Sequence, residues 1–213
     1  MNAHGRFLTV EGIEGVGKST QVTRLSAALR ERGIDHVVTR EPGGTPMAER
    51  IRELVLKSRD EPLPDIAELL LMFAARAVHV ANLVAPNLDA GRWVLCDRFI
   101  DATYAYQGGG RGLSSDTIRQ LQTLVLGTRQ PDLTVLLDAP VPHALKRAAQ
   151  RNAGAAVDRF ESERSDFFER VREVYRARAV AEPRRIAVLD ADQSVDEVAA
   201  EVLQLLKARA WIS

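Results

Sequence analysis

A glycine-rich octapeptide near the N-terminus carries the clearest chemistry in the 213-residue sequence. Residues 12–19 read GIEGVGKS, which fits the pattern G-x-x-x-x-G-K-[ST] between an apolar run and a helix-like segment. Glycines let successive backbone N–H groups turn toward a phosphate, and the following helix adds the positive end of its dipole. We expect Lys18 to hold the β- and γ-phosphates of a nucleotide and the Ser19 hydroxyl to bind Mg²⁺.

Two arginines stand near the ends of apolar runs that we interpret as strands. Arg40 follows the run at 36–39, and Arg98 follows the run at 93–96. We expect these strands to flank the first strand of a parallel sheet, whose carboxyl edge is where ligands bind in such folds. A single arginine is more often a solvated surface residue. Two guanidinium groups beside the γ-phosphate would instead suit a phosphorylated acceptor, because they pair bidentately with phosphate oxygens.

The elements that must position these residues alternate along the chain. Short apolar runs predict five strands, at residues 7–10, 36–39, 93–96, 133–137 and 186–189. Helical spacing occurs at residues 18–32, 46–57, 66–90, 114–126, 142–150, 161–181 and 195–208. This alternation predicts an α/β P-loop NTPase fold, with a five-stranded parallel sheet and helices on both faces. The chain is long enough for one sizeable core, so we expect a single domain over residues 1–213.

The composition and the motifs that the sequence lacks exclude several classes of function. The 29 basic and 29 acidic residues balance, so no overall positive field favours nucleic acid or a membrane surface. The sequence has no signal-peptide pattern and no run of about 18 apolar residues, and its single cysteine, Cys96, lies in an apolar run. We therefore expect a cytoplasmic protein that binds neither nucleic acid nor membrane. The motifs of GTPases and of transporter-type ATPases are also missing.

Further motifs follow the glycine-rich loop in order: REPGGT at 40–45, DRF at 97–99 and YAYQGGGRG at 104–112. With this combination the chain resembles the bacterial thymidylate kinases over nearly all of its length. The resemblance implies phosphorylation of dTMP to dTDP by ATP with Mg²⁺, in dTTP biosynthesis, and a homodimer formed through helices. The alternatives are a kinase for a different nucleoside monophosphate and a nucleotide-binding protein without transfer activity.

The resemblance also implies roles for residues at the phosphates. Arg40 and Arg98 would hold the phosphate of dTMP, with Arg98 also near the transferring group, and Asp97 would join Ser19 at Mg²⁺. Glu14 would contact the 3′-hydroxyl of the sugar or a metal-bound water. The residues implied at ATP are Gly12, Ile13, Glu14, Gly15, Val16, Gly17, Lys18, Ser19 and Thr20.

A second group of residues is implied at the thymine base. Phe73 and Arg76 lie three apart on a predicted helix and share a face, so a ring could stack on the base while the guanidinium donates to a base carbonyl. Sequence alone favours Phe73 as a core residue among leucines, and only the resemblance assigns it to the base. Thr103 and Gln107 would contact the hydrogen-bonding edge of thymine. Tyr106 would crowd the 2′ carbon against ribose, or would simply pack.

The transferring phosphoryl group needs a further cation, because its transition state is loose and charged. One branch of the family carries an arginine inside the glycine-rich loop, where this chain has Gly15. The resemblance therefore implies that a short mobile lid, residues 147–160, supplies the catalytic arginine. Arg147 and Arg151 lie four apart on one face of a predicted helix and lead into this lid.

We expect Arg151 to approach the phosphates and Arg147 to lie along the adenine, both as catalytic residues beside Lys18 and Arg98. Arg159, after the loop, is an alternative. The loop at 152–156 is rich in alanine and contains no arginine, which departs from the more basic lids of the family. A solvated helix face is the other interpretation of the two arginines.

Overall fold

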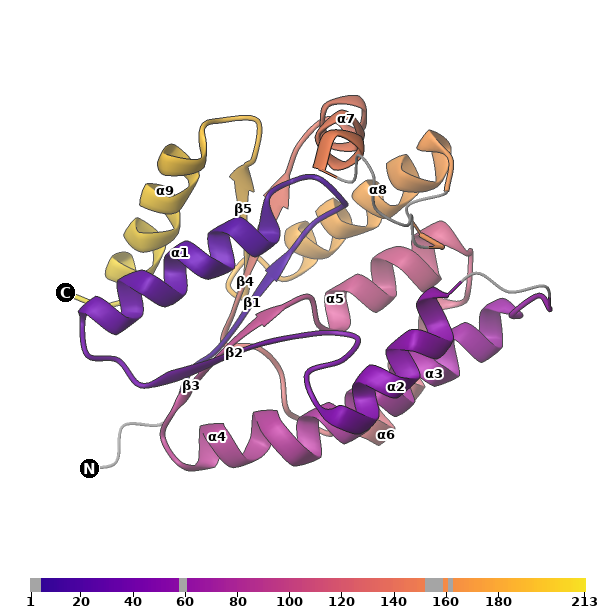
Figure 1. Ribbon diagram of the computed structural model, residues 1–213, viewed down its shortest axis with the longest axis horizontal. Helices are drawn as coiled ribbons and strands as arrows, with labels where there is room; N and C mark the ends of the chain where they lie inside the picture. The colour runs from indigo at the N-terminus through magenta and orange to yellow at the C-terminus, as the bar shows by residue number, and fades with distance from the viewer. Residues whose placement is uncertain (1–4, 58–60, 152–158, 161–162) are drawn as a thin grey trace.

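The computed structural model describes residues 5–57, 61–151, 159–160 and 163–213, so the predicted lid loop at 152–157 lies outside the described residues. Its strands form one parallel sheet in the order β2-β3-β1-β4-β5 (Figure 1). Their bounds are β1 Phe7–Glu11, β2 His36–Arg40, β3 Trp93–Asp97, β4 Leu133–Asp138 and β5 Ile186–Asp190. All five predicted strands are confirmed, and each extends one residue further at its carboxyl end.

The strand order corrects one expectation. Strand β1 pairs with β3 and β4, so the prediction that β2 also flanks β1 is wrong. A central strand of a parallel sheet is buried on both faces, which suits the apolar Val94, Leu95 and Cys96 of β3, whereas the partly exposed β2 suits the edge. Arg40 nevertheless stays close to the centre, because it pairs in register with Asp97.

Most predicted helices occur close to their expected bounds. They are α1 Lys18–Glu31, α2 Pro46–Leu56, α6 Ser115–Leu126, α7 Val141–Arg151, α8 Ser165–Ala181 and α9 Val195–Ala208. Helix α8 begins at Ser165, later than the predicted residue 161. Asp166 lies in its first turn, where a carboxylate complements the helix dipole.

The long apolar helix predicted over 66–90 is present as a continuous run with a widened turn. It consists of α3 (Asp65–His79), the π-helical turn η1 (Val80–Val84) and α4 (Ala85–Asp89). Pro86 has no N–H to donate and its ring crowds the preceding turn, so the ladder widens and the Ala85 N–H bonds to the carbonyl of Val80. By length and composition this run could cross a membrane. Its buried residues, such as Leu69 and Phe73, belong to the core of the protein.

One helical segment was not predicted. Residues after β3 form α5 (Ile100–Thr103) and continue in a π-helix, η2 (Tyr104–Gly110). The glycines that end η2 are typical of a loop in sequence. In the structure they allow η2 to pack closely against α8. A Cβ at Gly110 would overlap the ring of Phe167, and one at Gly109 would lie 2.8 Å from the carbonyl oxygen of Arg170.

The helices cover both faces of the sheet, as predicted. Figure 1 shows α1 and α9 together on one side, and α4, α5 and α8 on the other. Helix α9 packs through Val198, Val202 and Leu206, the apolar stripe expected of a helix that closes the core. Chain segments that follow β1, β2 and β3 meet at the carboxyl edge, where the candidate residues lie.

Candidate active site

The glycine-rich loop joins β1 to α1 at the centre of this edge. Gly12, Gly15 and Gly17 have φ values of 135°, 78° and 91°, a region that residues with a Cβ adopt at a cost. The ammonium group of Lys18 lies inside the loop and donates to the carbonyl of Ile13 at 2.7 Å. Burial, with the nearby positive Arg98, lowers the pKa of Lys18 to about 8. The loop therefore holds a buried cation among inward-facing backbone groups.

Gly15 also determines how closely helix α7 approaches the glycine-rich loop. A Cβ at this position would overlap the carbonyl oxygen of Ala144 in α7. A side chain at position 15 would thus need both a strained backbone and a displaced helix. Because Gly15 has no side chain, the glycine-rich loop directly contacts α7, the helix that carries Arg147 and Arg151. An arginine at position 15 would not fit in this contact.

Ser19 and Asp97, the two residues expected at Mg²⁺, are in contact. The Ser19 hydroxyl donates to Asp97 Oδ2 at 2.9 Å, and Asp97 is the last residue of β3. Among the described residues, no three His, Cys, Asp or Glu side chains gather where they could hold a metal ion by themselves. This donor set fits Mg²⁺, which is usually bound by one or two protein oxygens together with substrate phosphates and water.

Arg98 is the most constrained residue of the site. Its φ of 68° lies in the left-handed region, which costs a residue other than glycine roughly 1–2 kcal/mol. Its guanidinium donates to the carbonyl of Gly12 at 2.9 Å, to Glu14 Oε1 at 2.9 Å and to the hydroxyl of Tyr175 at 3.3 Å. It also lies 4.8 Å from the ring centre of Tyr106. Four partners thus hold one strained arginine beside the loop.

Glu14 connects the loop to the predicted sugar-binding tyrosine. One carboxylate oxygen accepts from Arg98, and the other accepts from the Tyr106 hydroxyl at 2.6 Å. Burial raises the pKa of Tyr106 well above its usual 10, and the Glu14 carboxylate adds to this against the opposing effect of Arg98. Tyr106 therefore stays protonated and acts as the donor.

Arg40 lies further out than Arg98. Its side chain is 55% exposed and donates to Glu49 Oε2 at 3.0 Å, and Glu49 also accepts from the N–H of Gly44 at 2.9 Å. Burial opposes ionisation of Glu49, but these two donors outweigh it and lower the pKa of Glu49. Arg40 is thus oriented by Glu49 of α2, which Gly44 holds in turn, while its guanidinium remains accessible.

A cavity with an excess of basic side chains brings most of the predicted phosphate residues together. We call it the basic cavity; it has a volume of about 230 Å³ and is lined by Glu14, Lys18, Ser19, Arg40, Glu41, Arg52, Asp97, Arg98 and Arg151. Sequence reasoning had found all of these except Glu41 and Arg52. Arg52 donates to the carbonyl of Pro42 at 2.8 Å. It belongs to no motif, and the sequence does not distinguish it from Arg50 on the same amphipathic helix.

The three lid arginines go to different places. Arg151 lines the basic cavity. Arg147 instead donates to the carbonyl of Ala191 at 2.9 Å and lies 3.4 Å from Asp192, at the connection between β5 and α9. Arg159 lies 2.8 Å from Glu68 in α3. Only the first of these arginines is directed to the predicted phosphate site.

A second cavity, which we call the apolar cavity, adjoins the first and shares Glu14, Glu41, Arg52 and Arg98 with it. Its remaining lining residues are Pro42, Leu56, Met72, Ala102, Tyr106, Gln107 and Phe160. Tyr106, expected beside the 2′ carbon, and Gln107, expected at the base, both line this cavity, whereas Arg76 and Thr103 do not. Phe73 is absent from this lining, and the residue before it, Met72, is present.

The burial of Phe73 shows why. Its ring is 2% exposed and packs in the core, 5.1 Å from the guanidinium of Arg76. The two residues share a face, as the spacing predicts, but that face is turned to the interior. Arg76 is itself 1% exposed and donates to Glu41 Oε2 at 2.7 Å and to the carbonyl of Phe99 at 3.1 Å. The helix turns Met72, one position earlier, toward the cavity.

Three predicted base residues carry buried polar atoms without a hydrogen-bond partner in the described part of the chain. These atoms are Arg76 Nη1, Thr103 Oγ1 and Gln107 Oε1. The amide nitrogen of Gln107 donates to Glu68 at 2.9 Å, which fixes the side chain and leaves its oxygen unpaired. Since unpaired buried polar atoms are costly, this pattern suits a ligand with polar groups of its own.

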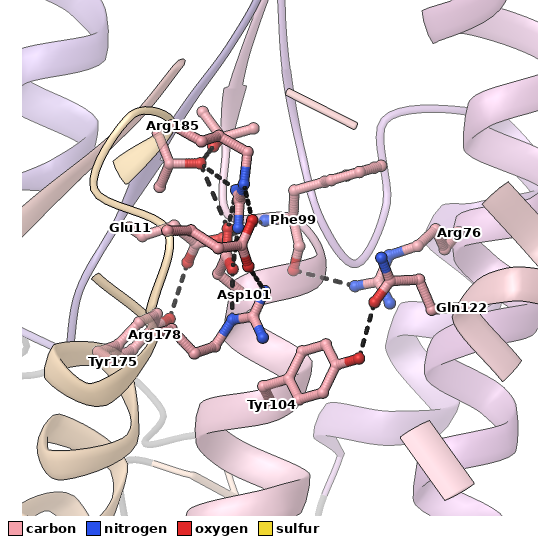
Figure 2. Close-up of polar contacts among 12 residues, drawn as sticks. Glu11, Arg76, Phe99, Asp101, Tyr104, Gln122, Tyr175, Arg178 and Arg185 are labelled. Atoms are coloured by element: carbon pink, nitrogen blue, oxygen red, sulfur yellow. Dashed lines mark hydrogen bonds and ion pairs between the residues drawn. The ribbon is translucent and has the colours of Figure 1, made fainter. Parts of the chain in front are cut away.

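A buried charge cluster beneath the site was not predicted (Figure 2). Asp101, 1% exposed, accepts from Arg178 at 2.6 Å and from Arg185 at 2.6 and 2.8 Å. Glu11, 0% exposed, lies beside it, and burial together with the Asp101 charge raises the pKa of Glu11 to about 7, against opposing effects of Arg98, Tyr175 and the Phe99 N–H. No local motif marks these residues, because their partners lie far apart in the sequence.

Comparison with known proteins places this arrangement in a family. Residues 10–202 match the family model described as thymidylate kinase. A thymidylate kinase of Teredinibacter turnerae is 56% identical over 204 residues, covering 96% of this chain and 98% of that protein. One of Alkalilimnicola ehrlichii is 50% identical over 211 residues, covering 98% and 96%. The crystal structure of thymidylate kinase from Ehrlichia chaffeensis superposes with a TM-score of 0.77 at 33% identity, covering 95% of this chain and 98% of that one. The chain therefore belongs to the thymidylate kinase family.

Proposed function

We propose that this member of the family transfers the γ-phosphoryl group of ATP to dTMP, forming ADP and dTDP. The observation that carries the proposal is the basic cavity, where Lys18 and Ser19 of the glycine-rich loop face Arg40, Arg98 and Arg151. Loop residues suit a donor phosphate, and the arginines suit a second phosphate opposite it. Two anionic groups brought together among fixed cations are what phosphoryl transfer between nucleotides requires.

On the donor side, backbone groups of residues 12–20 and the start of α1 would bind the phosphates of ATP. The Lys18 ammonium would exchange the Ile13 carbonyl for phosphate oxygens, and their negative charge would restore its pKa. Ser19 and Asp97 would hold Mg²⁺, which neutralises charge on the phosphate oxygens when bound. Removal of divalent cation with EDTA should abolish turnover, and added Mg²⁺ should restore it.

On the acceptor side, Arg40 and Arg98 would bind the phosphate of dTMP and the apolar cavity would receive the thymine. Gln107 lines this cavity and its unpaired Oε1 would face the edge of the base, while Met72 would form an apolar wall. Thr103 Oγ1, also unpaired, lies outside the lining and would reach the base only after a local movement. Tyr106, bonded to Glu14, would occupy the space beside the 2′ carbon. A ribose hydroxyl would then need room and a partner that this wall does not offer.

The chemistry follows from positioning and charge, without a covalent intermediate. Glu14, Lys18 and Arg98 line the same cavity, and Arg151 lines it from the end of α7. These cations would stabilise the charge on the transferring group and its bridging oxygens. Contact of the lid with bound nucleotide would exclude water and so suppress hydrolysis of ATP.

The direct test is a coupled assay of ADP release with purified protein, ATP and Mg²⁺ across nucleoside monophosphates. We expect turnover with dTMP, weaker turnover with dUMP, and little turnover with the ribonucleotide counterpart of dTMP, which carries a 2′-hydroxyl. Faster turnover with AMP or CMP than with dTMP would contradict the acceptor assignment. Nucleotide binding without ADP release in the presence of dTMP would indicate a binding protein instead.

We also propose that the protein is a cytoplasmic homodimer that associates through helices. Four apolar residues on α2 and α3 are about half exposed, which supports a helical contact surface: Met47, Leu54, Ile66 and Leu70. Light scattering behind a sizing column should give twice the mass of one chain. A single-chain mass at assay concentration would contradict the dimer while leaving the kinase assignment intact.

A further inference from the structure

The strained conformation of Arg98 needs a structural cause, and β1 supplies it on both sides of the residue. The N–H of Arg98 donates to the carbonyl of Val10 at 3.0 Å. The N–H of the next residue, Phe99, donates to Glu11 Oε1 at 2.7 Å. Two consecutive residues of the central strand thus hold the backbone at the point where the chain turns from β3 into α5.

The second oxygen of Glu11 reaches the other end of Arg98. Glu11 Oε2 accepts from the hydroxyl of Tyr175 at 2.7 Å, and that hydroxyl accepts from Nη1 of Arg98 at 3.3 Å. Glu11 and Tyr175 are 0% and 2% exposed, so neither interaction competes with bulk water. One carboxylate therefore holds the peptide group that follows Arg98 and reaches the Arg98 guanidinium through a single hydroxyl.

Helix α8 is fixed in place next to this link. Arg178, one helical turn after Tyr175, donates to Asp101 at 2.6 Å, and Asp101 belongs to the segment that begins at Phe99 (Figure 2). Rotation of α8 would therefore break a buried ion pair as well as move the Tyr175 hydroxyl. The same helix turn that neutralises Asp101 presents the hydroxyl to Arg98.

We propose that Glu11 and Tyr175 are positioning residues for phosphoryl transfer, which fix the backbone and the guanidinium of Arg98 in the orientation that the transferring group requires. Neither side chain lines the basic cavity, so they act through Arg98 and not on the substrate. This inference rests on the proposed function. A guanidinium that moves by about 1 Å loses much of its effect on a transition state while it can still attract a phosphate.

The test compares kcat and KM for Tyr175→Phe with those of a matched control. Tyr175→Phe removes only the hydroxyl that joins Glu11 to Arg98. The control is Tyr104→Phe, since the Tyr104 hydroxyl donates to Gln122 and points away from Glu11 (Figure 2). We expect Tyr175→Phe to lower kcat about tenfold or more, because hydrogen bonds to charged groups are worth that much, with KM for ATP within about twofold. The control should stay within about twofold of the parent in kcat.

A double-mutant cycle separates positioning from stability. In an Arg98→Lys background, Tyr175→Phe should have little further effect on kcat, because lysine lacks the planar fork that the hydroxyl orients. Glu11→Gln, which keeps the shape of the side chain, goes through the same cycle, so that the test does not depend on one variant folding. A purely structural role would lower the melting temperature and leave these couplings at zero.

The outcomes distinguish the two proposals. A parent that turns over dTMP, with Tyr175→Phe and Glu11→Gln at parental kcat, overturns the positioning role alone. Equal losses for Tyr175→Phe in the parent and Arg98→Lys backgrounds overturn it as well. A parent that releases no ADP with dTMP overturns the proposed function, and the positioning role with it. Non-additive losses confined to kcat support both.

Discussion

The carboxylate of Asp101 offers the sharpest test of how the buried charges stabilise this protein. Asp101→Asn keeps the size of the side chain but turns an amide N–H₂ toward the donors of Arg178 and Arg185. Breaking one partner of a buried ion pair costs about 3–5 kcal/mol. Both arginines keep a bond to Glu182, at 2.8 and 2.7 Å, so we expect the lower end, about 3 kcal/mol. For a chain of this size that corresponds to a fall in melting temperature of about 6–12 °C.

Thermal and urea denaturation at pH 7 measure this difference. The matched control is Asp116→Asn, which breaks the pair between Asp116 and Arg119 on the surface, where the side chains are 72% and 68% exposed. Exposed pairs contribute little, so the control should cost less than about 1 kcal/mol. An Asp101→Asn variant within about 1 kcal/mol of the parent, or as stable as Asp116→Asn, would refute the assignment of stability to the buried cluster.

The same cluster also predicts how the stabilising effect of Asp101 changes with pH. Burial favours protonation of Asp101, but Arg185 and Arg178 outweigh it and hold the pKa of Asp101 below its usual 3.8. A carboxyl group with a depressed pKa stabilises the fold above its unfolded pKa, and this contribution is lost as the pH falls through the folded value. The difference in free energy of unfolding between the parent and Asp101→Asn should therefore shrink below about pH 4. A constant difference down to pH 2 would contradict this.

Three further predictions concern the lid, the central strand and the glycine packing. Arg151→Ala should lower kcat much more than it raises KM for dTMP, as expected for a contact made in the transition state; an unchanged kcat in the coupled assay would move the role to another arginine. The folded pKa of Glu11, about 7, lies above its usual 4.5, so the free energy of unfolding of the parent should fall relative to Glu11→Gln as the pH rises from 4.5 to 7 in urea titrations. A difference independent of pH would contradict that shift. Gly110→Ala should cost about 1–3 kcal/mol by urea denaturation, because its methyl group overlaps Phe167; a neutral effect would show that η2 can move away from α8.

Local patterns in the sequence were enough to predict the sheet and the phosphate loop. Each strand is a short apolar run, and the loop depends on glycines at fixed spacing next to one lysine and one serine. The order of strands was harder, because a crossover of some fifty residues can return on either side of β1. The burial pattern of β2 against that of β3 carries this information, and it becomes visible only once both strands are placed.

Rotation about a helix axis limited the prediction of the thymine site. Phe73 and Met72 differ in direction by about 100° around α3. An assignment that is wrong by one residue therefore selects Phe73, which lies in the core, in place of Met72, which lines the apolar cavity. The helical conformation of η2 was not predicted, although Tyr106 and Gln107 within it were named as substrate residues. Glycines there remove side chains to admit α8, which in sequence cannot be told from glycines that form a loop.

The buried charges beneath the site follow from the demands on Arg98. The Arg98 guanidinium must keep its orientation whether or not a phosphate is bound beside it. The left-handed backbone of Arg98 can provide this orientation only if neighbouring residues hold the backbone in that conformation. Glu11 meets that need, but a buried carboxylate next to Asp101 is repelled by it. Arg178 and Arg185 neutralise Asp101 and allow both acids to lie in the interior. The cluster formed by Asp101 of α5, Arg178 of α8 and Arg185, just before β5, is therefore the electrostatic support for one arginine at the edge of the sheet. Changes in it should alter kcat as well as stability.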